Sequence, residues 1–166
     1  MIVQILNPNV HDRESFQNID SDIERFLKER ANQEHRKYIS DTYVVVDPNK
    51  ICIILGYFTL SNSALILNDI PSSLQKMIPG YPKIGTVLLG RIGRNTNHTE
   101  KGFGTIVLKY ALEKSLERGS FFALELNAKN SKLVDYYKSY GFIPTGEDPQ
   151  HMILPYASIK SALKSK

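Results

Sequence analysis

A buried strand, a polar loop and an amphipathic helix follow one another over residues 86–118. The strand ends near Gly93, and the apolar residues of the helix recur at the spacing of one helical face. Gly102 and Gly104 open this helix, where free backbone N–H groups point outward and carry partial positive charge. Because glycine has no side chain, such a backbone can wrap closely around a phosphate. The segment predicts either a phosphate cradle, with Lys101 adding a cation, or a tight strand-to-helix turn without a ligand.

The rest of the chain is rich in strand patterns before this loop and in helix patterns after it. Short apolar runs bounded by Pro, Asn and Ser predict strands, and 3.6-residue periodicity with glycine stops predicts helices. A capping box at residues 21–24 begins the first helix. The expected strands are 2–6, 43–46, 51–59, 64–67, 86–93, 121–126 and 152–154, and the expected helices are 21–31, 71–78, 104–118, 130–140 and 156–166. This order predicts an α+β (mixed α/β) sheet protein.

Length and composition predict one globular domain, residues 1–166. The apolar fraction is 42%, enough for a buried core. The single cysteine, Cys52, excludes an internal disulfide and a cysteine-rich zinc site, and its apolar neighbours predict a buried strand residue. We see no signal peptide and no apolar run near the roughly 20 residues that a membrane helix needs. We therefore expect a cytoplasmic protein without a membrane partner.

The positive charge of the chain is concentrated after residue 40. The net charge is +4, but residues 1–40 hold 6 basic and 7 acidic residues, whereas residues 41–166 hold 15 and 10. An enzyme that binds an anionic ligand in its C-terminal two-thirds has this distribution, and so does a modest nucleic-acid binder.

A second informative segment runs from Asn130 to Phe142. Asn130 can cap a helix through its side-chain oxygen, and Gly141 marks the end of that helix. Tyr137 lies on one face of the helix with Leu133, and its phenol can donate a proton. A role in proton transfer and a simple packing role both fit this position.

The two segments together resemble the Gcn5-related N-acetyltransferase (GNAT) family. Residues 99–104 match its acetyl-CoA motif, and residues 136–142 match its later Tyr-Gly-Phe element. The resemblance implies a central, mostly antiparallel twisted sheet that is flanked by helices and splayed at the central strand. The chain departs from the motif at Thr99, where the family carries Arg or Gln.

The resemblance also implies residue roles in acetyl transfer from acetyl-CoA to a primary amine. Backbone N–H groups near Ile92 and Arg94 would polarise the acetyl carbonyl. Tyr137 would protonate the leaving thiolate as a general acid. The implied cofactor-binding residues are Ile92, Arg94, Thr99, Glu100, Lys101, Gly102, Phe103, Gly104, Thr105 and Asn130.

The sequence assigns neither a metal site nor a general base. His11, His35 and His151 lack the spacing of metal ligands, so we expect no metal. Glu100 lies in the phosphate loop, where a base would be misplaced. A site without a strong base favours an α-amino group, which titrates near ~8, over a lysine, which titrates near ~10.4.

A narrower resemblance is to the acetyltransferase toxins of bacterial toxin–antitoxin pairs. It is carried by residues 26–31, 42–44, 56–61, 78–82 and 88–93, and the chain departs from it at Arg94. It implies a charged-tRNA substrate, with phosphates meeting Arg91, Arg94 and the C-terminal lysines. It also implies an antitoxin protein partner and a homodimer.

Three classes stay open from the sequence. The first is an acetyltransferase for aminoacyl-tRNA, the second acts on a small amine or a protein N-terminus, and the third is a non-catalytic CoA-binding module. Tyr137 argues against the third class.

Overall fold

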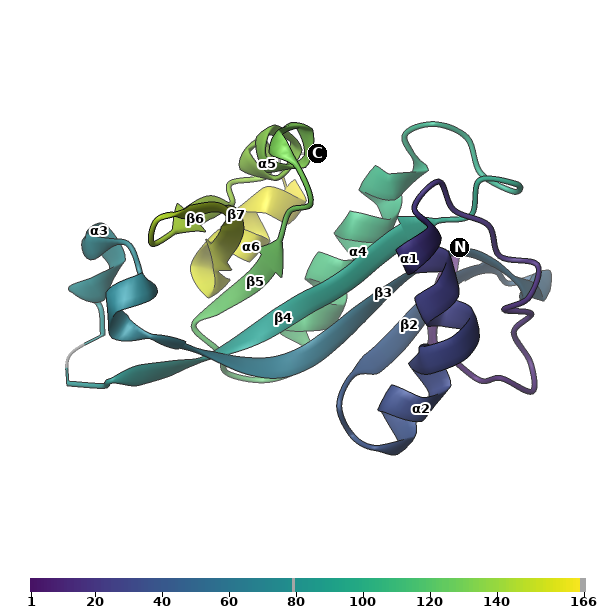
Figure 1. The fold of residues 1–166 in the computed structure, drawn as a ribbon, viewed down its shortest axis with the longest axis horizontal. Coiled ribbons are helices and arrows are strands. Elements are labelled where there is room, and N and C mark those ends of the chain that lie inside the picture. The colour runs from purple at the N-terminus through teal and green to yellow at the C-terminus, as the bar shows by residue number, and fades with distance from the viewer. Residues whose placement is uncertain (79, 165–166) are drawn as a thin grey trace. The chain divides into compact units, whose positions relative to one another are not determined.

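The computed structural model describes residues 1–78 and 80–164. Seven strands are hydrogen-bonded in the order β1-β2-β3-β4-β5-β7-β6. The pair β4–β5 is parallel, whereas β1–β2, β2–β3, β5–β7 and β6–β7 are antiparallel. This mixed, mostly antiparallel sheet with helices confirms the predicted fold class. The elements are β1 (Ile2–Ile5), α1 (Ser21–Arg25), η1 (Phe26–Arg30, a π-helix), α2 (Ala31–Arg36), β2 (Asp41–Asp47), β3 (Lys50–Ile66), η2 (Leu67–Asp69, a 3₁₀-helix), α3 (Ser72–Gln75), β4 (Lys83–Arg94), α4 (Phe103–Leu116), β5 (Ala123–Asn127), α5 (Ser131–Lys138), β6 (Ile143–Thr145), β7 (Asp148–Pro155) and α6 (Tyr156–Lys164) (Figure 1).

The chain forms two compact units, and the first comprises Met1–Ser61 and Leu89–Ala111. In this unit α1, η1 and α2 follow one another as one helical stretch (Figure 1), and α2 packs against β2. The spacing of apolar residues explains this packing, because residues three and four apart share one helical face. The core of the unit consists of Leu6, Phe16, Ile23, Phe26, Leu27, Ala31, Val44, Val46, Ile54 and Tyr57.

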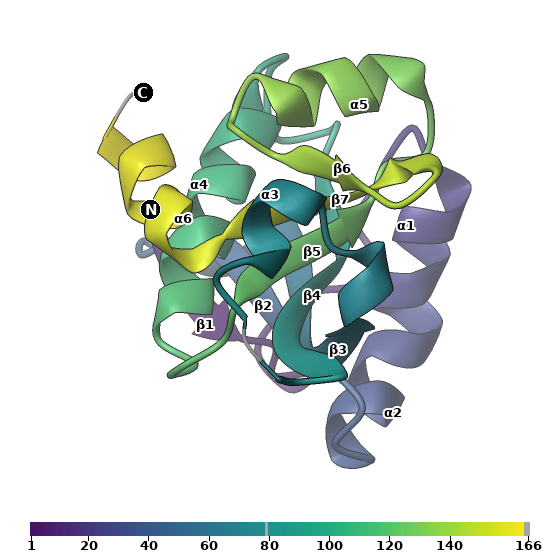
Figure 2. The same cartoon turned by 90° about the vertical axis from the view of Figure 1, so that its left-hand side faces the viewer.

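The second unit comprises Asn62–Leu88 and Leu112–Lys166. Here α5 and α6 both pack against β7, and Figure 2 shows α5 lying along the β6–β7 pair. A smaller core joins the segment around α3 to β5 and β7, through Leu65, Ile70, Ile78, Ala123 and Ile153.

Two predicted strand boundaries are wrong. The expected break at Ser61-Asn62 does not occur, and β3 continues from Lys50 to Ile66. Polar residues continue a strand when they alternate between exposed and more buried positions, as Ser61, Asn62 and Ser63 do. The last strand, β7, is also longer than expected. β6 precedes it and was not predicted, because its three residues are too few to show a strand pattern.

The first helix starts at Ser21 as expected, but the predicted capping box at residues 21–24 and the predicted burial of Cys52 are wrong. Asp20 is the N-cap of α1, because its carboxylate accepts a hydrogen bond from the Asp22 N–H at 3.0 Å. Cys52 is exposed, since it lies near the solvent-facing turn that joins β2 to β3.

The expected helix stops are confirmed by Gly119 and Gly141, whose φ angles are 89° and 90°. Pro79, within the 78–82 string of the toxin resemblance, and the last two residues of the expected 156–166 helix lie outside the described residues. No helix within residues 1–78 and 80–164 is long and apolar enough to cross a membrane.

Candidate active site

The predicted phosphate cradle lies where the loop after β4 enters α4. Gly102 has φ +98°, a conformation that side-chain-bearing residues rarely adopt. A Cβ at Gly102 or Gly104 would meet no atom within 4 Å, so the space beside both glycines is open. Together with the start of the 14-residue helix α4, this open backbone fits an anionic ligand.

Two of the backbone N–H groups that could bind a phosphate form hydrogen bonds within the loop instead. The Phe103 N–H donates to the Glu100 carbonyl at 3.2 Å, and the Thr105 N–H donates to the Gly102 carbonyl at 3.0 Å. This narrows the candidate phosphate donors to the N–H groups of Lys101, Gly102 and Gly104.

Arg94 takes a structural part in the loop. Its Nη1 donates to the Thr99 carbonyl at 2.8 Å and to Thr99 Oγ1 at 3.3 Å. The Thr99 hydroxyl in turn donates to the Asn95 carbonyl. The two positions that depart from the family patterns, Arg94 and Thr99, therefore contact each other and fix the loop before its glycines.

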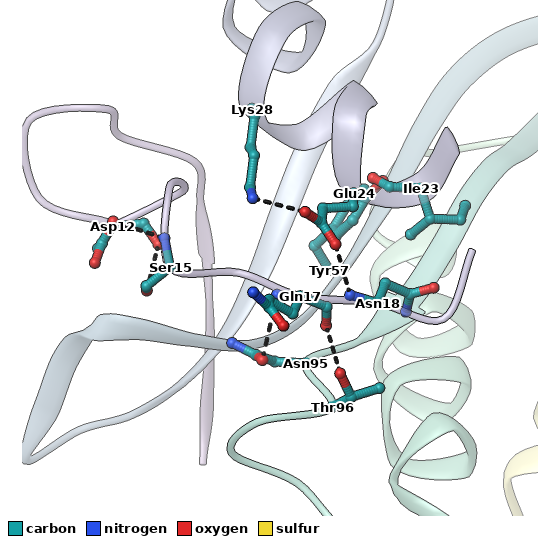
Figure 3. Close-up of polar contacts among 10 residues, drawn as sticks. All are labelled: Asp12, Ser15, Gln17, Asn18, Ile23, Glu24, Lys28, Tyr57, Asn95 and Thr96. Carbon is teal, nitrogen blue, oxygen red and sulfur yellow. Dashed lines mark hydrogen bonds and ion pairs between the residues drawn. The ribbon is translucent and has the colours of Figure 1, made fainter. Parts of the chain in front are cut away.

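Asn95 anchors the base of this loop and was missed by the sequence analysis. It is fully buried, and its Nδ2 donates to the Ile54 carbonyl at 2.9 Å. Its Oδ1 accepts from the Gln17 N–H at 3.4 Å (Figure 3). The same oxygen accepts from the Asn97 N–H at 3.1 Å. The only signal in the sequence was a polar residue directly after a buried strand.

The segment before α1 crosses the end of β4. Thr96 donates to the Gln17 carbonyl from its N–H at 2.9 Å, and Asn18 Nδ2 donates to the Arg94 carbonyl at 2.8 Å. Glu24 accepts from the Asn18 N–H at 3.1 Å and from Lys28 Nζ at 2.7 Å (Figure 3). The hydrogen bond from Lys28, followed by that from Asn18, lowers the pKa of Glu24. Glu24 therefore anchors the segment before α1 through Asn18 and does not form the predicted capping box.

Ile92 and Arg94 lie in the part of β4 beyond its pairing with β5. The two strands pair at Val87↔Leu124 and Leu88↔Glu125, and β4 then continues to Arg94. The resemblance implies a central strand splayed from its neighbour, and the pairing of β4 with β5 does end at Leu88.

Tyr137 and Asn130 belong to the second unit, on and before α5. Asn130 caps the helix as predicted, because its Oδ1 accepts from the Leu133 N–H at 3.0 Å. Tyr137 is 6% exposed and packs edge-on against Tyr136 and Phe142. Burial raises the pKa of Tyr137 to about 12, so the phenol keeps its proton at neutral pH.

The remaining candidate groups divide between exposed and internal positions. Glu100 and Lys101 are exposed, as is His98. The Arg91 guanidinium lies 3.8 Å from the centre of the Phe26 ring, a cation–π contact inside the first unit. Among the described residues, no three His, Cys, Asp or Glu side chains are grouped so that they could hold a metal ion.

Comparison with known proteins agrees with this geometry. No family model matches the chain. It is 25% identical to the probable toxin TacT of Sinorhizobium fredii (strain NBRC 101917 / NGR234), over 98% of this chain and 94% of that protein. The structure of AtaT complexed with acetyl-methionyl-tRNAfMet is 30% identical, with a TM-score of 0.82 over 96% of this chain and 97% of AtaT.

A further solved relative carries a tyrosine-to-phenylalanine substitution. This AtaT variant, bound to the C-terminus of the antitoxin AtaR and to acetyl-CoA, is 25% identical, with a TM-score of 0.75 over 96% of each chain. The chain therefore belongs to the GNAT acetyltransferases, and within them to the toxins of toxin–antitoxin systems.

Proposed function

We propose that the protein transfers the acetyl group of acetyl-CoA to the α-amino group of an aminoacyl-tRNA. The observation that carries this proposal is the open glycine backbone at the start of α4, where a Cβ at Gly102 or Gly104 would meet no atom within 4 Å. The N–H groups of Lys101, Gly102 and Gly104 would bind the pyrophosphate, and Thr99, Glu100, Phe103 and Thr105 would shape the loop around it. Two solved AtaT relatives contain acetyl-CoA or the acetylated tRNA.

The chemical step would use the end of β4 and the phenol of α5. The bound cosubstrate supplies an activated acetyl thioester. Backbone N–H groups at Ile92 and Arg94 would stabilise the developing oxyanion. Tyr137 would protonate the leaving thiolate, and a pKa of about 12 supports this role because the proton is present at neutral pH. Asn130 contributes by fixing the start of the helix that carries Tyr137.

The proposed tRNA-binding residues include exposed lysines as well as the two arginines. Arg94 donates to Thr99 from Nη1 and Arg91 stacks on Phe26, and each guanidinium has further N–H groups that could bind a phosphate. Lys101, Lys109 and Lys160 are exposed and belong to the basic part of the chain after residue 40. We propose that such lysines contact the tRNA backbone.

The relatives also indicate where such an activity would operate. We propose that residues 1–166 act as one acetyltransferase domain in the cytoplasm, where charged tRNA is found. An antitoxin protein is the proposed inhibitor, since an AtaT relative is bound to the C-terminus of AtaR. The homodimer stays a prediction.

Transfer of label from acetyl-CoA tests this proposal. We expect label on bulk charged tRNA, and little on spermidine or free amino acids. Gly102→Glu should lose acetyl-CoA binding in calorimetry and transfer to every acceptor, because a charged side chain enters the cradle in a strained backbone. Label on spermidine but not on charged tRNA would instead identify a small-amine acetyltransferase. Full binding by the Gly102→Glu variant would place the cradle elsewhere.

A further inference from the structure

Three polar side chains of the second unit form a hydrogen-bonded row across three strands. Glu125 of β5 is 4% exposed. Its Oε1 accepts from the Thr86 hydroxyl of β4 at 2.6 Å, and its Oε2 accepts from His151 Nε2 of β7 at 2.8 Å. The sequence analysis gave none of these residues a role in catalysis.

The row lies on one face of the sheet, next to the small core of this unit. Ala123 and Glu125 are two residues apart, so they share a face, and Ile153 is the direct partner of Glu125. Ala123 and Ile153 belong to the apolar core, whereas Glu125 and His151 come next on the same face. The hydrogen-bonded row therefore lies directly beside the apolar core on this face of the sheet.

The row also marks the place where β4 and β5 part. Leu88↔Glu125 is the last pair between the two strands, after which β4 runs on toward Ile92 and Arg94. Under the proposed function, the reacting acetyl group is polarised by the backbone that lies beyond this pair. Tyr137, the proposed acid of that reaction, lies on α5, which packs within the second unit against β7, the strand that carries His151.

The imidazole of His151 is the solvent-accessible end of the row. The side chain of His151 is 24% exposed and that of Glu125 is 5% exposed. A carboxylate only accepts hydrogen bonds, so Nε2 is the donor to Glu125 and Nδ1 is the ring nitrogen left to accept a proton from a substrate. On β6, the Thr145 hydroxyl donates to the His151 backbone carbonyl at 3.2 Å, a contact that does not involve the imidazole.

A purely structural explanation of the row is weak on energetic grounds. Removing a carboxylate from water is costly, and apolar side chains of similar volume often stabilise a fold as well or better. The pair His35–Asp41 shows the ordinary alternative, because both of its side chains are more than a third exposed. A buried carboxylate hydrogen-bonded to a partly exposed imidazole, as Glu125 is to His151, is an arrangement suited to proton transfer.

We propose that His151 is the proton acceptor for the attacking amine and that Glu125 is its positioning residue, an inference that rests on the proposed function. The amine nitrogen forms the new C–N bond with the acetyl carbon, and the C–S bond breaks. The proton lost by the nitrogen passes to Nδ1 of His151. The thiolate takes a proton from Tyr137, so the products are an amide and a thiol. The imidazolium of His151 then loses its proton to solvent and the phenolate of Tyr137 regains one from solvent, which restores both residues.

His151→Gln tests the proposal, with His35→Gln as the matched control. Glutamine can still donate to Glu125, but it accepts no proton. We expect kcat/KM for charged tRNA to fall about 10²-fold or more, within the range typical of general acid–base groups. The Kd for acetyl-CoA should stay unchanged in calorimetry, which also shows that the variant is folded.

The pH profile separates proton transfer from a structural role. On the acid side of the wild-type profile, log kcat/KM should rise with a slope of two, from the substrate amine and His151. The His151→Gln profile should keep only the slope of one from the amine, and the His35→Gln profile should match the wild type. Glu125→Gln should lower kcat/KM while acetyl-CoA binding persists.

The possible failures are distinguishable. If wild-type protein acetylates charged tRNA and His151→Gln keeps its rate and slope of two, the inference is overturned and the proposed function stands. If wild-type protein transfers no acetyl group, the proposed function fails and this inference fails with it.

Discussion

At the scale of single residues, Tyr137 is set apart by its surroundings. Its ring packs against Tyr136 and Phe142, and burial raises the pKa of its hydroxyl to about 12. Tyr137→Phe removes the proton donor and leaves the packing ring. We therefore expect turnover to fall about 10²–10⁴-fold, the usual contribution of a general acid, with an unchanged Kd for acetyl-CoA.

Tyr136→Phe is the control for this substitution, because its ring lies next to Tyr137 on the same helix. Its turnover should equal that of the wild type in single-turnover kinetics. Unchanged turnover in Tyr137→Phe would remove Tyr137 from the mechanism and leave water as the acid.

The roles of some of these residues could be predicted from their neighbours in the sequence, whereas the roles of others became visible only in the folded structure. Asn130 as a cap and Gly141 as a helix stop follow from their immediate neighbours, and both were predicted. Asn95 bonds to a carbonyl 41 residues away, and Glu125 accepts from a hydroxyl 39 residues away. No sequence pattern places such partners side by side before the sheet is formed.

At the scale of elements, Asn95 joins β3, β4 and the segment before α1. Asn95→Ala would leave the Ile54 carbonyl and the N–H groups of Gln17 and Asn97 without this partner. The Ile54 carbonyl is the buried partner, and a buried group left unpaired costs about 1–3 kcal/mol, so we expect the free energy of unfolding to fall by about that amount.

Urea denaturation measures this loss. Asn97→Ala is the matched control, because Asn97 is exposed, and it should change the free energy of unfolding by no more than about 0.5 kcal/mol. Equal stability of the two variants would show that the Asn95 amide does not anchor the loop.

Element types were predicted better than their ends. The strand–loop–helix segment was correct because a buried run and a helical face have different periods. The start of α1 was correct but its N-cap was wrong, because Asp20 and Ser21 are both good caps. Glu24 accepts hydrogen bonds from Asn18 and Lys28 and so does not form the capping box. The unbroken β3 was missed because Ser and Asn also end strands.

At the scale of the whole molecule, the chain's family was predictable because two ordered motifs, residues 99–104 and 136–142, carry it. The charge distribution was less informative, since the sequence shows where arginines occur but not what they contact. Arg91 and Arg94 both counted toward the net charge of the basic part, yet the structure uses them internally. The net charge alone therefore does not show which cations contact a phosphate.

Salt dependence tests whether exposed lysines bind the tRNA. Each phosphate contact adds about −0.9 to the slope of log affinity against log salt. With about three contacts, kcat/KM for charged tRNA should fall roughly 40-fold between about 50 and 200 mM salt. The rate with a small amine should barely change.

Charge reversal on α6 sharpens this test. Lys160→Glu removes an exposed lysine of the basic C-terminal part, so it should reduce the steepness of the salt slope by about one. Lys37→Glu is the control, because Lys37 is equally exposed but lies within the first 40 residues, which are net acidic. Steady-state rates at several salt concentrations give each slope. Equal slopes for all three proteins would remove α6 from the tRNA interface, and a flat wild-type slope would contradict phosphate recognition altogether.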